Sequence, residues 1–150
     1  MIRRFVRRNS RNLFLLIILV VLITLALYND MINEGTMKNI KHIDILTINS
    51  IFIGFLFTTL GVIVGFLGNT KIANSDRAGY MDEYYNTIYF GLVFFIVSAV
   101  SGLAAIFLDN MYDNQYVLII EQVAIIMGVA FFIKAIFNLA SIIKKVRKNL

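Results

Sequence analysis

Residues 45–68 read ILTINSIFIGFLFTTLGVIVGFLG, and this stretch decides the fold. It carries no charged side chain, and as a helix it is long enough to cross a bilayer, which takes about 20 residues. Residues 13–28, 87–108 and 116–143 form three further apolar stretches of similar kind. The stretches do not alternate with period two, as β-barrel strands of about 9–11 residues do. The sequence therefore predicts an all-α membrane protein, with four transmembrane helices in one bundle and a single domain over residues 1–150.

The composition agrees with this class of protein. Apolar residues make up 59% of the chain and charged residues 15%, whereas soluble domains have about 45–50% and about 25%. A water-soluble fold of this size cannot bury so much apolar surface, and a disordered chain is excluded by the same values. There is no Cys and only one His, so no disulfide framework, metal cluster or other cofactor is expected.

The basic residues predict the orientation, because cytoplasmic segments carry an excess of Lys and Arg. The side of the predicted bundle opposite the termini has only Lys38 and Lys41. The side with both termini and the loop over residues 69–86 has Arg3, Arg4, Arg7, Arg8, Arg11, Lys71, Arg77, Lys144, Lys145, Arg147 and Lys148. We therefore expect both termini to be cytoplasmic. The high usage of Ile and Asn suggests an AT-rich bacterial genome, so the membrane is expected to be the inner membrane of a bacterium. The basic residues flank helices and meet lipid headgroups, so no nucleic-acid partner is expected.

The first apolar stretch admits two interpretations. A basic start followed by an apolar run is typical of a secretory signal peptide. However, the run ends in LALYND, which contains no A-x-A-like cleavage site. A retained membrane anchor is the favoured interpretation.

One stripe of the second predicted helix consists of small or hydroxylated residues at spacings of three and four, which on a helix share one face. The stripe comprises Thr47, Ser50, Gly54, Thr58, Gly61, Gly65 and Gly68. Opposite it lie larger side chains such as Phe52, Phe55, Phe57, Ile63 and Phe66. Small residues let helix backbones approach closely in lipid, so this face is predicted to pack on protein.

Shorter seams of the same kind occur in the third and fourth predicted helices. The third has Gly91, Ser98, Gly102 and Ala105, and the fourth has Ala124, Gly128, Ala135 and Asn138. The simplest architecture packs helices two, three and four through their seams and leaves the first helix outside. Because four helices need not bury every seam, a homo-oligomer built around helix two or four is a further hypothesis.

Two ionisable residues, Glu121 and Lys134, lie inside the predicted spans, where charges usually mark function. Glu121 is expected to point inward, at a depth similar to that of Asn49 and Ser50. It is interpreted either as a cation or proton site near an outer vestibule or as an interfacial residue that reaches water. Lys134 is interpreted either as extending toward the cytoplasmic headgroups or as buried or lining a pore. Asn138, one turn beyond it, is either its partner or part of a helix contact.

The loop over residues 69–86 is the most distinctive soluble segment. Ser75 or Asp76 is a candidate cap for a new helix in it. Tyr80, Tyr84 and Tyr85 follow, and tyrosines at this depth form either an aromatic belt or a docking surface for a cytoplasmic partner. The chain has no paired acids, Ser–His arrangement or phosphate-binding loop of the kinds that carry catalysis. We therefore do not expect an enzyme.

The segments Thr47–Ser50 and Gly54–Thr58, then Gly61, Gly79–Asp82 and Tyr84–Tyr85, resemble a pattern in small bacterial membrane proteins. The chain is similar in size, helix count and termini to the four-helix membrane component of Kiwa-type anti-phage defence systems. This resemblance covers the outline of the chain and includes no diagnostic motif. It implies a homo-oligomeric membrane sensor that works with a cytoplasmic effector. The alternative function is a small ion channel or transporter, with Glu121 and Asn49 along the path.

Overall fold

A computed structural model of the chain describes residues 6–29, 41–108, 112 and 114–147. Within these ranges all regular structure is helical, and four helices are long and apolar enough to span a membrane. The elements, in chain order, are α2 (Ser10–Tyr28), α4 (His42–Gly65), the 3-10 helix η1 (Phe66–Gly68), α5 (Thr70–Arg77), α6 (Asp82–Phe107) and α7 (Gln115–Arg147). The all-helical class and the four apolar helices predicted from sequence are confirmed.

The helices extend beyond the apolar runs that predict them. α2, α4 and α6 each begin three to five residues earlier than the corresponding run. α7 has 33 residues, or about 50 Å at 1.5 Å per residue, which exceeds the roughly 30 Å of hydrocarbon in a bilayer. The two loops expected opposite the termini fall mostly on residues 30–40, 109–111 and 113, outside the described residues. Polar residues next to the apolar runs are therefore parts of helices.

The segment over residues 69–86 contains its own short helix, α5. The Asn69 side chain caps it by accepting a hydrogen bond of 3.1 Å from the backbone N–H of Lys71. The expectation of a helix start at Ser75 or Asp76 is wrong, because both residues lie in the second half of α5. Gly79, with φ of 77°, then turns the chain into α6; this left-handed conformation is open to glycine without a steric penalty.

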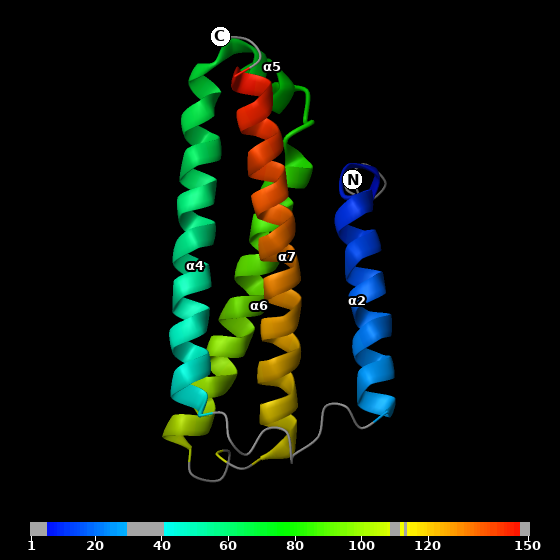
Figure 1. Ribbon diagram of the computed structural model, residues 1–150, viewed down its shortest axis with the longest axis vertical. Coiled ribbons are helices and arrows are strands. Elements are labelled where there is room, and N and C mark those ends of the chain that lie inside the picture. The colour runs from blue at the N-terminus through cyan, green and yellow to red at the C-terminus, as the bar shows by residue number, and fades with distance from the viewer. Residues whose placement is uncertain (1–5, 30–40, 109–111, 113, 148–150) are drawn as a thin grey trace.

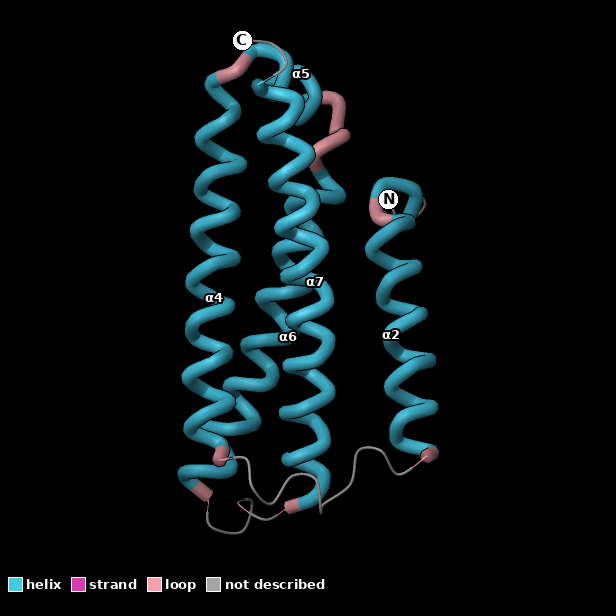
Figure 2. The backbone as a smooth tube through the Cα atoms, viewed as in Figure 1, coloured by secondary structure: helices cyan, strands magenta, loops and turns pink. Residues whose placement is uncertain are grey.

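Three helices, α4, α6 and α7, pack together, while α2 stands beside them (Figures 1 and 2). The start of α2, the end of α7 and all of α5 lie toward one end of the molecule, here called the basic end. Asn12 is the one buried residue of α2. In this structure α2 therefore contributes little to the buried core.

Two glycines allow α6 and α7 to approach closely. A Cβ built on Gly128 of α7 would lie 2.8 Å from the ring of Phe95 of α6. A Cβ built on Gly91 of α6 would lie 2.9 Å from Leu56 Cδ1 and 3.5 Å from Phe131 Cβ. In each helix a glycine therefore packs against a Phe of the other helix: Gly128 against Phe95, and Gly91 against Phe131. The seams of the third and fourth helices pack on protein as predicted, because Gly102, Ala124 and Ala135 are buried as well.

The second helix packs through the face opposite to the expected one. Its buried residues are His42, Ile45, Asn49, Leu56, Thr59 and Ile63. The whole small-residue stripe, comprising Thr47, Ser50, Gly54, Thr58, Gly61, Gly65 and Gly68, is exposed. A Cβ added at any of its four glycines meets no atom within 4 Å. The expectation that this stripe packs on helices of the same chain is wrong, because the larger side chains of the other face fill the space between α4, α6 and α7.

Candidate functional site

A buried ion-pair partner for Glu121 comes from the first residue of α4. Glu121 Oε2 lies 2.7 Å from His42 Nδ1, and the two side chains are 0% and 4% exposed. His42 Nε2 lies 3.1 Å from the backbone carbonyl oxygen of Tyr112. A carbonyl oxygen only accepts, so Nε2 carries a proton and donates it. One further proton is shared between Nδ1 and Oε2, and the pair is neutral overall whichever atom holds that proton.

Two more side chains extend this pair into a cluster that joins α4, α6 and α7. Asn49 Nδ2 donates to Ser98 Oγ at 2.9 Å, and Ser98 Oγ donates to the backbone oxygen of Glu121 at 2.9 Å. Both Asn49 and Ser98 are fully buried. We call His42, Asn49, Ser98 and Glu121 the His–Glu cluster. It lies away from the basic end and fixes the relative positions of the three packed helices.

Two oxygens of the His–Glu cluster, Asn49 Oδ1 and Glu121 Oε1, have no hydrogen-bond partner among the described residues. Glu121 Oε1 packs against the backbone of Gly102, where a Cβ would overlap it. The glycine in the α6 seam therefore makes room for a carboxylate as well as for a helix. Unsatisfied buried oxygens are unfavourable in a low-dielectric core, and an ionisable group between transmembrane helices is a candidate for function.

The sequence-based interpretations of this region are partly right. Glu121 points inward, and it shares a cluster with Asn49 through Ser98. The interpretation of Glu121 as a residue that reaches water is wrong, because its side chain is 0% exposed. Ser50 is outside the cluster: it is exposed, and its hydroxyl donates to the Leu46 carbonyl of its own helix at 2.9 Å.

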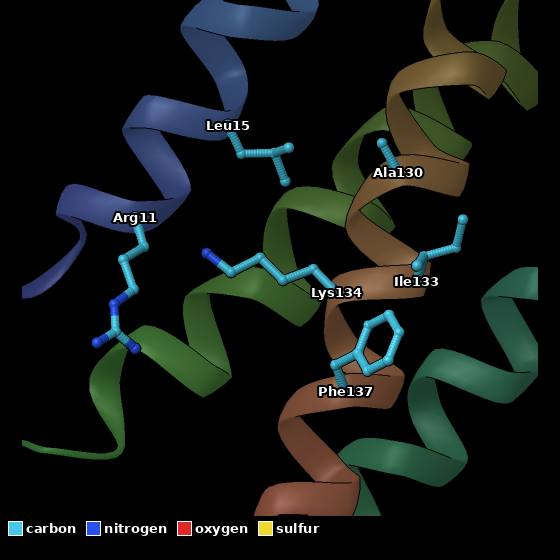
Figure 3. A pocket seen from close by; sticks show the side chains of 6 residues that line it. All are labelled: Arg11, Leu15, Ala130, Ile133, Lys134 and Phe137. Carbon is cyan, nitrogen blue, oxygen red and sulfur yellow. The ribbon is translucent and has the colours of Figure 1, made fainter.

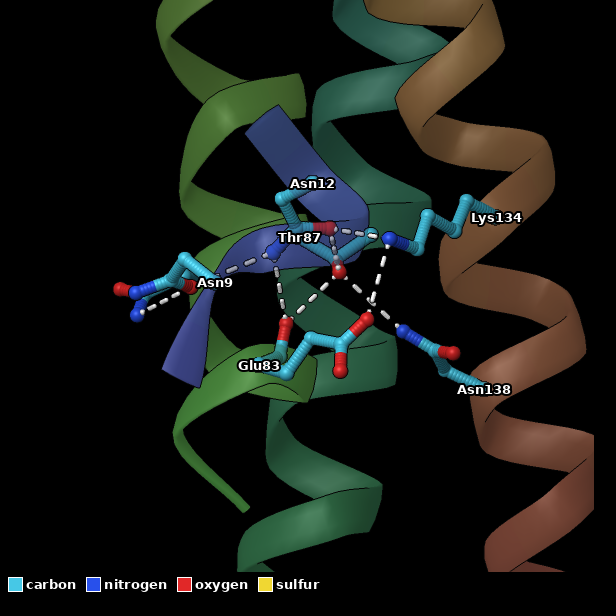
Figure 4. A network of polar contacts seen from close by, with 7 residues as sticks. Asn9, Asn12, Glu83, Thr87, Lys134 and Asn138 are labelled. Carbon is cyan, nitrogen blue, oxygen red and sulfur yellow. Dashed lines mark hydrogen bonds and ion pairs between the residues drawn. The ribbon is translucent and has the colours of Figure 1, made fainter. Parts of the chain in front are cut away.

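A second polar group, nearer the basic end, surrounds Lys134 (Figure 4). Lys134 Nζ donates to Asn12 Oδ1 at 2.5 Å and lies 3.2 Å from Glu83 Oε1. The Lys134 and Glu83 side chains are 19% and 20% exposed. Because Asn12 belongs to α2 and Glu83 to α6, a single ammonium group connects three helices. We call Asn9, Asn12, Glu83, Thr87, Lys134 and Asn138 the Lys–Glu network.

The rest of the Lys–Glu network holds α2 against α6. Asn12 Nδ2 donates to the backbone oxygen of Glu83 at 3.0 Å, and Thr87 Oγ1 donates to Asn12 Oδ1 at 2.8 Å. Asn9 Oδ1 accepts from Asn86 Nδ2 at 2.9 Å. Arg8 adds an ion pair of 2.6 Å with Asp82. The polar contacts of α2 with the other helices therefore concentrate in its first turns and the residues just before it.

The structure shows what the Lys134 side chain reaches. Its ammonium group contacts oxygens of Asn12 and Glu83, which belong to the first turns of α2 and α6. Asn138 is part of the helix contact and donates to Thr87 Oγ1 at 3.2 Å. Sequence reasoning missed Asn12, Glu83 and His42. Each lies one to four residues outside an apolar run, and that adjacency is the signal that points to them.

An apolar layer separates the two polar groups. Along α7 it includes Phe131, along α6 Phe95, and along α4 Leu56, and all three side chains are 0% exposed. The rings of Phe52 and Phe95 stack in the same layer at 5.1 Å between centroids. Protons or ions therefore have no continuous polar path between the His–Glu cluster and the Lys–Glu network through the core of the conformation described.

The three candidate docking tyrosines separate into two kinds. Tyr80 is 75% exposed at the turn between α5 and α6. Tyr84 and Tyr85 are half-buried and pack on the hydrophobic core, and Lys145 Nζ lies 6.0 Å from the ring centroid of Tyr84. Of the three, Tyr80 is the residue whose side chain is open to a partner.

Comparisons of this chain with protein-family models, curated proteins and solved structures found no match. In the described ranges, no group of three or more His, Cys, Asp or Glu side chains is placed to hold a metal ion. The features of the chain that bear on function are the two polar groups and the exposed face of α4.

Proposed function

We propose that the chain is an integral protein of a bacterial inner membrane that self-associates through α4 and presents its basic end to a cytoplasmic partner. In this proposal it is a sensor or effector component. The Lys and Arg distribution supports a cytoplasmic basic end, and the four apolar helices support the membrane location.

The exposed small-residue stripe of α4 is the observation that carries the proposal. Glycine inside a helix is unfavourable by about 0.5–1 kcal/mol relative to Ala, and the stripe has Gly54, Gly61 and Gly65 with no neighbour within 4 Å of an added Cβ. Against lipid, glycines at these positions bring no packing gain. Against a second α4, they let two backbones approach closely, as in other small-residue helix contacts.

Native mass spectrometry of the complex, extracted gently from its own membranes, tests self-association. We expect more than one copy for the wild type and a shift toward one copy for Gly61→Leu. Ala140→Leu is the matched control, because Ala140 is exposed on α7 and the substitution adds a group of nearly the same size to the surface away from the stripe. A wild-type protein that is always a single copy contradicts the proposal.

The cytoplasmic partner is assigned to the surface around Tyr80. A copurifying soluble protein is expected to be lost in Tyr80→Ala while the copy number stays unchanged. Tyr89→Ala is the matched control, because Tyr89 is also an exposed tyrosine but lies within α6, away from the turn that carries Tyr80. The assignment to anti-phage defence depends on the resemblance to Kiwa-type components alone. Phage plating on cells with and without the gene tests that assignment separately.

The His–Glu cluster favours a second candidate, a small transporter or channel for protons or cations. It has a buried pair in which His42 Nδ1 and Glu121 Oε2 lie 2.7 Å apart, and two oxygens that have no partner in the part of the chain that the structure describes. Flux into proteoliposomes distinguishes the candidates: a transporter loses flux in Glu121→Gln and keeps it in Asp44→Asn, which removes an exposed acid near the same end of α4. If neither the wild type nor a variant carries flux, the interaction protein is the remaining candidate.

A further inference from the structure

A polar pocket of about 430 Å³ lies at the basic end, where α2, α5, α6 and α7 meet. Three cations line it: Arg7 just before α2, Arg11 in the first turn of α2, and Lys145 near the end of α7. Ser10 and Ser75 add hydroxyl groups to its wall. Arginine forks, an ammonium group and hydroxyls are the donors that bind phosphate oxygens in proteins.

Two acids near the pocket, Glu83 and Asp82, are paired with bases that do not line it, Lys134 and Arg8. Glu83 lines the pocket, and its Oε1 lies 3.2 Å from Lys134 Nζ. Asp82, the preceding residue, is paired with Arg8 at 2.6 Å. Among the described residues, neither Arg7 nor Arg11 forms an ion pair. The pocket therefore has a positive potential that suits an anion.

An apolar groove of about 360 Å³ lies next to this pocket, between α2 and α7 (Figure 3 shows the residues that line the groove). Arg11 lines both spaces. Beyond Arg11 the groove is lined by Leu15, one turn deeper in α2, and by Ala130, Ile133, Lys134 and Phe137 of α7. The Lys134 ammonium group is held by Asn12 and Glu83, so Lys134 adds its aliphatic stem to the apolar wall. Because these residues lie inside the apolar helices, the groove runs from the basic end toward the middle of the membrane.

The pocket and the groove together fit a ligand that has both an anionic group and an apolar chain. A soluble anion would fit only the pocket. A soluble phosphate compound or an acidic peptide would occupy the pocket and leave the groove unused. A phospholipid carries an anionic phosphate and its acyl chains on one glycerol backbone, so its charged and apolar parts lie side by side, as the pocket and the groove do at Arg11. Basic pockets between transmembrane helices are also a known way to hold anionic headgroups.

We propose that the pocket of Arg7, Arg11 and Lys145 and the α2–α7 groove form one binding site for an anionic phospholipid. The phosphate lies among the three cations, and one acyl chain lies along Leu15, Ile133 and Phe137. The site requires insertion in a membrane, which the proposed function shares. It requires neither self-association nor a particular orientation of the basic end.

Native mass spectrometry with equal amounts of palmitoyl-oleoyl phosphatidylglycerol and phosphatidylcholine tests the site on the full chain. We expect one phosphatidylglycerol retained per chain in preference to phosphatidylcholine. Lys145→Gln and Arg11→Gln should each weaken its retention about fivefold, since a basic residue near an anionic headgroup contributes about 1 kcal/mol. Lys144→Gln is the matched control, because it makes the same change one residue away and does not line the pocket.

A second variant tests the groove without changing any charge. Ala130→Phe fills the groove beside Leu15, so retention of phosphatidylglycerol should fall while circular dichroism still reports the helices of the wild type. If that variant fails to fold, Phe137→Ser is the second variant, because Phe137 is exposed and lines the groove. Loss of its ring should also lower the retention of phosphatidylglycerol. Retention unchanged in the folded groove variants overturns the assignment of the acyl chain.

Three further outcomes overturn the proposal. Equal retention of the two lipids, or equal losses in Lys144→Gln and Lys145→Gln, would show attraction to surface charge instead of a site. Displacement of phosphatidylglycerol by millimolar inorganic phosphate would show a soluble-anion site. Because lipid is counted per chain, a monomeric protein that still retains one phosphatidylglycerol would contradict self-association and leave the lipid site intact.

Discussion

Glycine has opposite surroundings on the two sides of this molecule. Between α6 and α7, Gly91, Gly102 and Gly128 face atoms that an added Cβ would overlap or press against. On the outer surface of α4, Gly54 and Gly61 face open space. The first set forms a contact within the chain, and in our account the second forms a contact between chains. The same sequence pattern thus predicts close packing and does not identify the partner.

The largest effect is expected for Gly128→Leu. A Cβ there would lie 2.8 Å from the Phe95 ring, and a whole Leu side chain must push α6 away from α7. Overpacking of this kind is unfavourable by about 1–3 kcal/mol, and we expect the upper end of that range. Unfolding in micelles by increasing dodecyl sulfate, followed by circular dichroism, measures it. A Gly128→Leu variant as stable as the wild type would contradict the described contact between α6 and α7.

A smaller loss is expected for Gly102→Ala, through the His–Glu cluster. The added methyl group displaces Glu121 Oε1, so the carboxylate must move and its bond to His42 weakens. A buried polar group left without its partner is unfavourable by about 1–3 kcal/mol, and we expect about 2 kcal/mol. The same unfolding assay measures it. Gly102→Ala combined with Glu121→Ala should be less destabilised than the two single losses added together, because the clash is removed.

For Gly61→Leu we expect a stability of the single chain within about 0.5 kcal/mol of the wild type, as for other surface substitutions. Self-association should weaken, because Leu holds two α4 backbones apart. Energy transfer between labelled copies in vesicles, measured over a range of protein-to-lipid ratios, reports the change. Unfolding as severe as that of Gly128→Leu would mean that the stripe packs inside the chain.

The smallest effect is expected for Gly54→Ala, which should raise the stability of the single chain instead of lowering it. A methyl group at this position meets no atom within 4 Å, and Ala is favoured over Gly in a helix by about 0.5–1 kcal/mol. Stability to dodecyl sulfate should therefore rise slightly. Gly91→Ala is the matched substitution on the packed side and should lower stability, because its methyl group would press on Leu56.

The sequence predicts the four helices well, because long apolar runs have few other solutions in a membrane. It predicts the packed faces of α6 and α7 from their seams, and it places Glu121 inward. It fails on the face of α4, because a stripe of small residues is compatible with a neighbour in the same chain or in another. Here Leu56 and Ile63 fill the intrachain contact, and that choice depends on the tertiary arrangement.

The candidate site is less predictable than the fold. His42, Asn12 and Glu83 lie just outside apolar runs, where hydropathy assigns loops. A helix can continue through such a residue when its charged or polar side chain pairs with one on a neighbouring helix. Glu121 pairs with His42 in this way, and Lys134 pairs with Glu83. The partners are 79 and 51 residues apart in sequence, so spacing within one segment does not reveal them.

Single-cysteine cross-linking along α4 in native membranes tests the central claim most directly, because the chain has no cysteine of its own. Cysteines are introduced singly at Ser50, Gly54, Thr58 and Gly61 on the stripe, and at the exposed Ile51, Phe55 and Val62 beside it. The account predicts disulfide-linked dimers with a maximum at every third or fourth residue along the stripe. Equal cross-linking at all seven positions, or none at any of them, would contradict it.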